Sequence, residues 1–158
     1  MFIVSLVACK SRQAREFNDE IVHKYASLLP EVNAAEGKIM QYINNGNYDS
    51  VVVVAEKMEQ LADDKIIEVQ NLSLPDVNGA AAFRNSFVTF FEYIKSIYSN
   101  YKSYGQANPG KDREAASKIV LAILRNKDTV VNSMQKIQKA FAESNGFKIE
   151  QNVGASDK

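Results

Sequence analysis

The chain has 158 residues, with 19 basic and 19 acidic side chains and therefore no formal net charge. This balance argues against a nucleic-acid-binding protein, which normally carries an excess or a patch of basic residues. The length is enough for one domain with a real core, and no apolar stretch of the sequence reaches the ~20 residues that a bilayer-spanning helix needs. A single cysteine allows no internal disulfide, so packing alone must stabilise the fold.

The N-terminus holds the one strongly apolar run, residues 2–8, and directly after it the one cysteine, Cys9. The segment Leu6-Val7-Ala8-Cys9 resembles a bacterial lipobox, where a signal peptidase cuts just before a lipid-modified cysteine. The resemblance implies that residues 1–8 are the remnant of a lipoprotein signal peptide. It also implies that the thiol of Cys9 takes a diacylglyceryl group through a thioether, and that the polar residues 9–16 form a short tether. The alternative is an apolar N-terminal turn packed on the core, with Cys9 as an ordinary buried thiol.

Apolar residues recur at spacings of three and four between about Gln13 and Asn45, which predicts an amphipathic helix. The stripe consists of Phe17, Ile21, Tyr25, Leu28, Val32, Ala35, Ile39 and Tyr42. Pro30 lies inside the segment, and proline removes one backbone hydrogen bond and clashes with the preceding turn. Because the stripe keeps its phase across the proline, we expect one helix kinked near Pro30 rather than two separate helices.

A second helix is expected after an N-cap at Asp49 or Ser50. Residues 51–54 are all valine and would by themselves suggest a strand, but the helical pattern that follows, as far as Val69, favours a helix on grounds of length. The carboxylates of this helix are interleaved with lysines, which is typical of a solvated helix face.

The third helix is predicted from about Asn78 to Tyr104 and the fourth after Asp112, its expected cap, as far as Phe141. The fourth is rich in cations, so complementary charge could help it to pair with the second. Gly46, Gly105 and Gly146 each follow a helical pattern. A left-handed glycine commonly closes a helix at that position.

Four long amphipathic helices joined by short loops are best satisfied by an all-α, antiparallel up-down-up-down four-helix bundle. We expect the bundle to comprise residues 17–146. Residues 152–158 are small and polar, and we expect residues 147–158 to form a flexible C-terminal tail.

The residues offer little for catalysis or metal binding. Glu20 and His23 match the Glu-x-x-His motif of di-iron bundles, but those proteins need two such motifs and this chain has one histidine. His23 also falls off the apolar stripe. Cys9 has no second histidine that could act as its base, and no Gly-rich phosphate motif is present. We therefore expect no enzyme, no metal and no cofactor, although a ligand carried in the bundle interior remains an alternative.

The third helix carries an unusual aromatic load. Its phenylalanines are interpreted as a thick aromatic core. Tyr98, Tyr101 and Tyr104 lie toward its C-terminal end among serines and asparagine, where they predict a wet aromatic binding surface for a peptide or a glycan. The competing interpretation is that these rings cap the core with their hydroxyls in water.

The lipobox-like start and the all-helical body resemble small bacterial envelope lipoproteins of uncharacterised function. The resemblance implies export, acylation at Cys9 and attachment to a membrane through that lipid, with another envelope protein or a glycan as the possible partner. Lys10 stands where an aspartate commonly retains such proteins at the inner membrane, which favours the outer membrane. A soluble cytosolic helical interaction module is the alternative.

Overall fold

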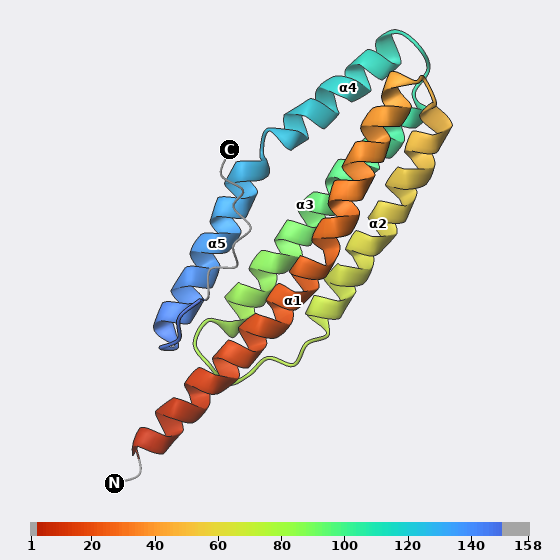
Figure 1. Cartoon of the computed structure of the whole chain (residues 1–158). Coiled ribbons are helices and arrows are strands. Elements are labelled where there is room, and N and C mark those ends of the chain that lie inside the picture. The colour runs from red at the N-terminus through yellow and green to blue at the C-terminus, as the bar shows by residue number, and fades with distance from the viewer. Residues whose placement is uncertain (1–2, 150–158) are drawn as a thin grey trace.

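The computed structural model describes the backbone of residues 3–149 and the side chains of residues 8–149. All regular structure in this part of the chain is α-helical, so the predicted all-α class is confirmed. The helices are α1 (Ile3–Asn44), α2 (Tyr48–Gln70), α3 (Ala80–Gln106), α4 (Lys111–Leu124) and α5 (Lys127–Ser144). They form an elongated body in which α1, α2 and α3 lie side by side, while α4 and α5 follow one another along it (Figure 1).

The first helix, α1, covers the whole segment that periodicity predicts and extends further toward the N-terminus. Six members of the predicted stripe are buried, namely Phe17, Ile21, Leu28, Val32, Ala35 and Ile39, and so are Ala14 and Asn18. Pro30 lies inside the helix on its exposed side, and helical structure continues on both sides of it. The expectation of one helix rather than two is therefore confirmed.

The prediction of a separate tether over residues 9–16 is wrong. These residues are a continuous part of α1, and Ala14 among them is completely buried. The hydroxyl of Ser11 donates a hydrogen bond to the carbonyl of Gly146 at 3.3 Å. The segment is polar because most of its side chains lie on the exposed face of a helix, while Ala14 sits one turn before Phe17 on the core face.

The second helix, α2, begins slightly earlier than predicted. Its N-cap is Asn47, whose side chain accepts a hydrogen bond from the backbone N–H of Ser50 at 3.3 Å. Asp49 and Ser50, the expected caps, lie inside the first turn. Residues 51–54 are helical, as predicted on grounds of length. Only Val51 of the four is fully buried, which is the pattern expected when one face of a helix meets the core.

The third helix, α3, supplies most of the core. Phe83, Phe87, Phe90 and Phe91 are buried, as their interpretation as core predicts. Phe83 of α3 stacks on Phe141 of α5 with ring centroids 4.5 Å apart, and it meets Phe17 of α1 edge to face at 6.0 Å. Such aromatic pairs add about 0.5–1.5 kcal/mol beyond their burial, so this cluster joins three helices.

Gly105 does not end a helix, contrary to the prediction. It lies inside α3, whereas Gly46 and Gly146 adopt positive φ directly after a helix as expected. A Cβ atom built on Gly105 would lie 2.7 Å from Cγ2 of Val52 and 2.9 Å from the carbonyl oxygen of Tyr48. Glycine is therefore needed here for the close approach of α3 to α2.

The predicted fourth helix is interrupted. The chain leaves the α4 axis at Arg125 and Asn126 and resumes as α5, although neither residue is glycine or proline. Val120, Ile123 and Leu124 lie on the inner side of α4, and Lys127, about one turn later, is exposed. The expected cap Asp112 lies within the first turn of α4, after an N-cap at Gly110.

The C-terminal segment is packed on the body as far as the structure describes it. Phe147 is half-buried, and its ring meets Phe141 edge to face at 5.8 Å. Its backbone N–H bonds to the carbonyl of Ala142 at 3.1 Å. The predicted flexible tail is therefore wrong at Phe147, while its residues 150–158 lie outside the described part of the chain.

Candidate functional site

The candidate lipidation residue, Cys9, is exposed on α1, so the alternative that it is an ordinary buried thiol is wrong. Lys10, its neighbour, forms a 3.0 Å ion pair with Asp76 of the loop between α2 and α3, and both side chains are largely exposed. Among the described side chains, the first to be fully buried is Ala14. The thiol is thus separated from the core by little more than one helical turn.

A hollow of about 950 Å³ opens beside Cys9, between the start of α1, the α2–α3 loop and the end of α5. Its lining is mixed, with Lys10, Asp76 and Glu143 beside small polar groups and Val77. The amide of Asn145 donates to the carbonyl of Asn78 at 2.8 Å and so joins the loop to α5. This contact holds the α2–α3 loop against the end of α5, at the end of the body where Cys9 lies.

The predicted tyrosine surface is wrong for two of its three members. Tyr98 and Tyr101 are 1% and 8% exposed, and they continue the buried stripe of α3 after Phe91 and Ile94. The hydroxyl of Tyr98 donates to the carbonyl of Val32 at 3.4 Å. Burial raises the pKa of Tyr98, and the charge of nearby Glu36 raises it further. Both rings belong to the core. The hydroxyl of Tyr98 is bonded inside it, so the alternative that these tyrosines cap the core with hydroxyls in water is wrong for Tyr98.

Tyr104, the third member, is half-buried at the far end of the body from Cys9. Its ring meets Tyr48 of α2 edge to face at 5.9 Å. On Tyr48 lies the guanidinium of Arg113 of α4, with its carbon 3.5 Å from the ring centroid. Arg113 also donates from Nη2 to the carbonyl of Ala107 at 2.6 Å.

Sequence reasoning missed this cluster of Tyr48, Tyr104 and Arg113. It lies beside a small hollow of about 360 Å³ lined by the α1–α2 turn and the α3–α4 turn. The cation–π contact joins residues sixty-five positions apart in the chain, and no motif in the sequence marks it. Its evident effect is to join the two turns.

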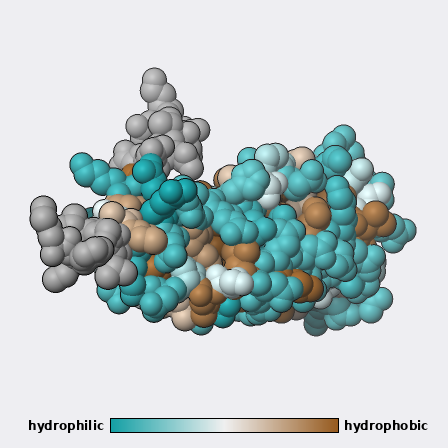
Figure 2. Space-filling view, turned by 90° about the horizontal axis from the view of Figure 1, so that it is seen from below, coloured by the Kyte–Doolittle hydropathy of each residue, from teal (hydrophilic) through white to brown (hydrophobic). Residues whose placement is uncertain are grey.

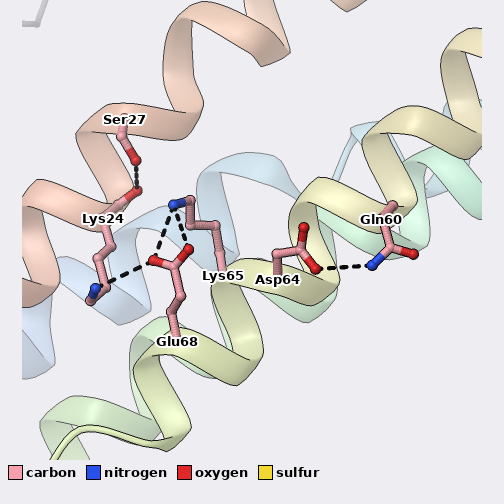
Figure 3. Close-up of polar contacts among 6 residues, drawn as sticks. All are labelled: Lys24, Ser27, Gln60, Asp64, Lys65 and Glu68. Atoms are coloured by element: carbon pink, nitrogen blue, oxygen red, sulfur yellow. Dashed lines mark hydrogen bonds and ion pairs between the residues drawn. The ribbon is translucent and has the colours of Figure 1, made fainter.

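The acidic face of α2 is paired rather than simply solvated. Glu68 accepts hydrogen bonds from Lys65 at 3.0 and 3.1 Å and from Lys24 of α1 at 3.3 Å (Figure 3). Burial acts to raise the pKa of Glu68, but the hydrogen bonds and charges of the two lysines outweigh it and the pKa lies below its usual value. The contact of Lys24 with Glu68 thus joins α1 to α2, while Lys65 pairs with the same carboxylate within α2.

Other carboxylates of α2 pair with α3. Asp63 meets Lys95 at 2.7 Å, Glu59 accepts from Ser99, and Lys102 lies 3.3 Å from Glu59. The cation-rich fourth helix was the expected partner of these carboxylates, but none of these pairs involves it. Partly exposed pairs of this kind each contribute little to the free energy of unfolding. Their main effect is to favour α3 as the neighbour of this face of α2.

The residues considered for catalysis are not brought together. Cys9 and His23 lie on one helix, fourteen residues and so about 21 Å apart, and His23 is exposed. The interior that a ligand carrier would need is occupied, at its centre, by Phe83, Phe87 and Phe91, each at most 1% exposed. The absence of catalysis remains a prediction.

The surface in Figure 2 is mostly hydrophilic, with hydrophobic areas scattered between hydrophilic ones. None of the helices described is long and apolar enough to cross a membrane. No protein-family model matches the chain, and comparison with curated proteins and with solved structures finds no significant match. The fold alone defines the class of protein here, which is an all-α protein of packed helices.

Proposed function

We propose that this chain is a membrane-anchored helical-bundle lipoprotein of the bacterial envelope, with a binding or structural role and no catalysis. The observation that carries the proposal is the unique Cys9 directly after an apolar run, in Leu6-Val7-Ala8-Cys9. Two features of the fold support it. Cys9 is exposed, and cleavage before it would leave every described core side chain, from Ala14 onward, in the body.

The lipid would determine where the protein is found. A diacylglyceryl thioether on Cys9 and an acyl chain on its new amino group would supply three chains, whereas one chain gives only marginal membrane binding. Lys10 after the anchor favours the outer membrane. A partner, whether another envelope protein or a glycan, would meet the exposed surface of the body.

We further propose that the body is an up-down-up-down antiparallel bundle in which α4 and α5 together form the fourth member, with α1 bent at Pro30. Contacts at the two ends support this order. Arg113 and Tyr48 bring the α3–α4 and α1–α2 turns together at one end. Asn145 and Asn78 bring the end of α5 to the α2–α3 loop at the other.

The first experiment is mass spectrometry of the N-terminal peptide, from protein expressed in a bacterial host that processes lipoproteins. The expected result is a peptide that begins at Cys9 and carries acyl chains. The matched control is Cys9→Ser, which should yield an unmodified protein with the same helical circular dichroism, because the side chain at position 9 is exposed.

An unmodified wild-type peptide that retains Met1 would overturn the lipoprotein assignment. The chain would then be better described as a cytosolic helical interaction module. Fractionation separates the membrane assignment from the modification itself, since an acylated protein found in the inner membrane would contradict only the proposed outer-membrane location.

A further inference from the structure

The loop between α2 and α3, residues 71–79, exposes an apolar side chain. Leu72 and Val77 of this loop pack on the core, whereas Leu74 between them is 45% exposed. The loop lies at the same end of the body as the start of α1 (Figure 1). A single exposed leucine is common on soluble proteins, so its position relative to Cys9 is what gives it a meaning.

The loop is held in place on both sides of Leu74. Before it, Arg84 of α3 donates from Nη1 to the carbonyl of Leu72 at 3.3 Å. After it, the N–H of Val77 donates to the carbonyl of Pro75 at 2.9 Å. The leucine side chain is thus presented by a fixed backbone, and a contact made by it would not have to order the loop first.

A direct contact places this loop beside the residue that follows Cys9. Nζ of Lys10 lies 3.0 Å from Oδ2 of Asp76, and both residues line the hollow beside Cys9. Asp76 follows Leu74 by two residues, which span at most about 7 Å. A lipid on the thiol of Cys9 would therefore bring the loop to the bilayer surface with it.

We propose that Leu74 is a second membrane contact beside the lipid anchor, with its side chain inserted among the headgroups as far as the start of the acyl chains. This inference rests on the proposed anchoring at Cys9. Its driving force is the removal of an exposed leucine side chain from water. The contact would leave the body free to turn about the line from Cys9 to Leu74.

The surroundings of Leu74 limit how deeply it can insert. Backbone polar groups without partners are costly in hydrocarbon, so the loop backbone has to stay where water can reach it. The ion pair of Lys10 and Asp76 has to remain among the headgroups for the same reason. The contact is therefore interfacial, made by one side chain.

The charges near the anchor do not oppose this contact. Lys10 pairs with Asp76, and Arg12 pairs with Glu16 at 2.8 Å. Paired charges are neither strongly attracted to anionic lipids nor strongly repelled by them. The contact should therefore form on a zwitterionic bilayer, where apolar burial alone drives it.

Tryptophan fluorescence in the full chain tests the contact, because the sequence contains no tryptophan. Leu74→Trp is coupled through the exposed thiol of Cys9 to a maleimide-bearing phospholipid in phosphatidylcholine vesicles. The matched control is Val53→Trp. Val53 is 66% exposed, and seventeen residues of α2, about 26 Å, separate it from the end of that helix at Gln70.

We expect the emission of Leu74→Trp to shift to the blue on coupling. It should also be quenched by phosphatidylcholine that is brominated near the top of its acyl chains. Val53→Trp should show neither effect. Both variants should keep the circular dichroism of the wild type, because both side chains are exposed.

Emission from Leu74→Trp that is neither shifted nor quenched would overturn the contact. A blue shift without quenching by brominated lipid would also overturn it, and would assign Leu74 to a contact with a second copy of the chain. The coupling supplies the anchor chemically, so these readings do not depend on acylation by a host. The mass of the N-terminal peptide tests the proposed function separately.

A second measurement keeps the chain free of tryptophan. A single acyl chain coupled to Cys9 holds a protein on a vesicle only marginally, so a second contact raises the fraction that is bound. Leu74→Asp should lower the partition constant about fivefold or more, because it removes an apolar contact and adds a charge. Val53→Asp should leave it unchanged, and equal partition constants for the two variants would contradict the proposal.

Discussion

Two glycines inside helices have opposite surroundings. Gly105 in α3 faces Val52 and the backbone of Tyr48 so closely that a Cβ atom would lie within 3 Å of both. Gly37 in α1 has nothing within 4 Å of the same position. The first glycine is required by packing, whereas the second carries the helix-propensity cost of glycine with no contact in return.

Alanine substitutions should therefore have opposite effects. Gly105→Ala should lower the free energy of unfolding by about 1–3 kcal/mol, because the added methyl group overpacks the α2–α3 contact. Gly37→Ala should raise it by about 1 kcal/mol through helix propensity. Urea unfolding followed by circular dichroism measures both, and a stabilising Gly105→Ala would show that α3 does not approach α2 as closely as described.

Tyr98 should make the free energy of unfolding depend on pH. Its burial raises the pKa of its phenol above the usual value near 10. The neutral ring therefore stabilises the folded state fully below about pH 10, and this contribution is lost as the pH rises toward the raised pKa.

The free energy of unfolding should accordingly fall above about pH 10, by up to ~1.4 kcal/mol per pH unit for each tyrosine that ionises only when unfolded. Tyr98→Phe should make this fall less steep and cost no more than about 1.5 kcal/mol at neutral pH. Urea midpoints across the alkaline range test this. A wild-type slope in the variant would mean that Tyr98 ionises in the folded protein.

At the scale of the helices, Pro30 is the clearest point of weakness. It lies inside α1 and removes one backbone hydrogen bond, but its ring is exposed and makes little core contact. Pro30 therefore lowers the free energy of unfolding, as proline in a helix interior does, and burial of its ring does not offset this loss.

Pro30→Ala should raise the free energy of unfolding by about 1–2 kcal/mol. The gain stays below the ~3 kcal/mol of a proline in an isolated helix, because alanine also frees the unfolded chain. Asn33→Ala, one turn away and also exposed, is the control for propensity and should gain about 0.5 kcal/mol. Thermal unfolding of both variants measures these changes in stability. A destabilised Pro30→Ala would show that a bend at this point is needed for packing.

Helix periodicity could be read from the sequence because the core of this protein is built from residues at spacings of three and four. The same spacing already placed Tyr98 and Tyr101 in line with Phe83, Phe87 and Phe91, but their polar neighbours suggested a surface. The α4–α5 break was not predicted, because neither Arg125 nor Asn126 is a glycine or a proline. The contact of Tyr48 with Arg113 could not be predicted, because it depends on how two distant turns pack.

At the scale of the whole molecule, the described core begins at Ala14. A chain that starts at Cys9 should therefore keep its helical content, with a free energy of unfolding within about 1 kcal/mol of the full chain. Ala14→Asp should cost about 3 kcal/mol or more, because it buries an unpaired charge. Circular dichroism in urea tests both, and a large loss on removing residues 1–8 would place part of the core before Cys9.

The continuity of α1 through residue 9 has a mechanical consequence for an anchored protein. Five helical residues advance about 7 Å from Cys9 to Ala14, whereas five residues of extended chain could reach about 17 Å. The helical link also resists bending. If Cys9 carries the proposed lipid, the body would therefore pivot as one piece about the acyl chains, with no flexible segment between them and Ala14. Its far end, with Tyr48 and Arg113, would sweep an arc whose radius is set by the length of the body, and a partner that binds there would have to lie on that arc.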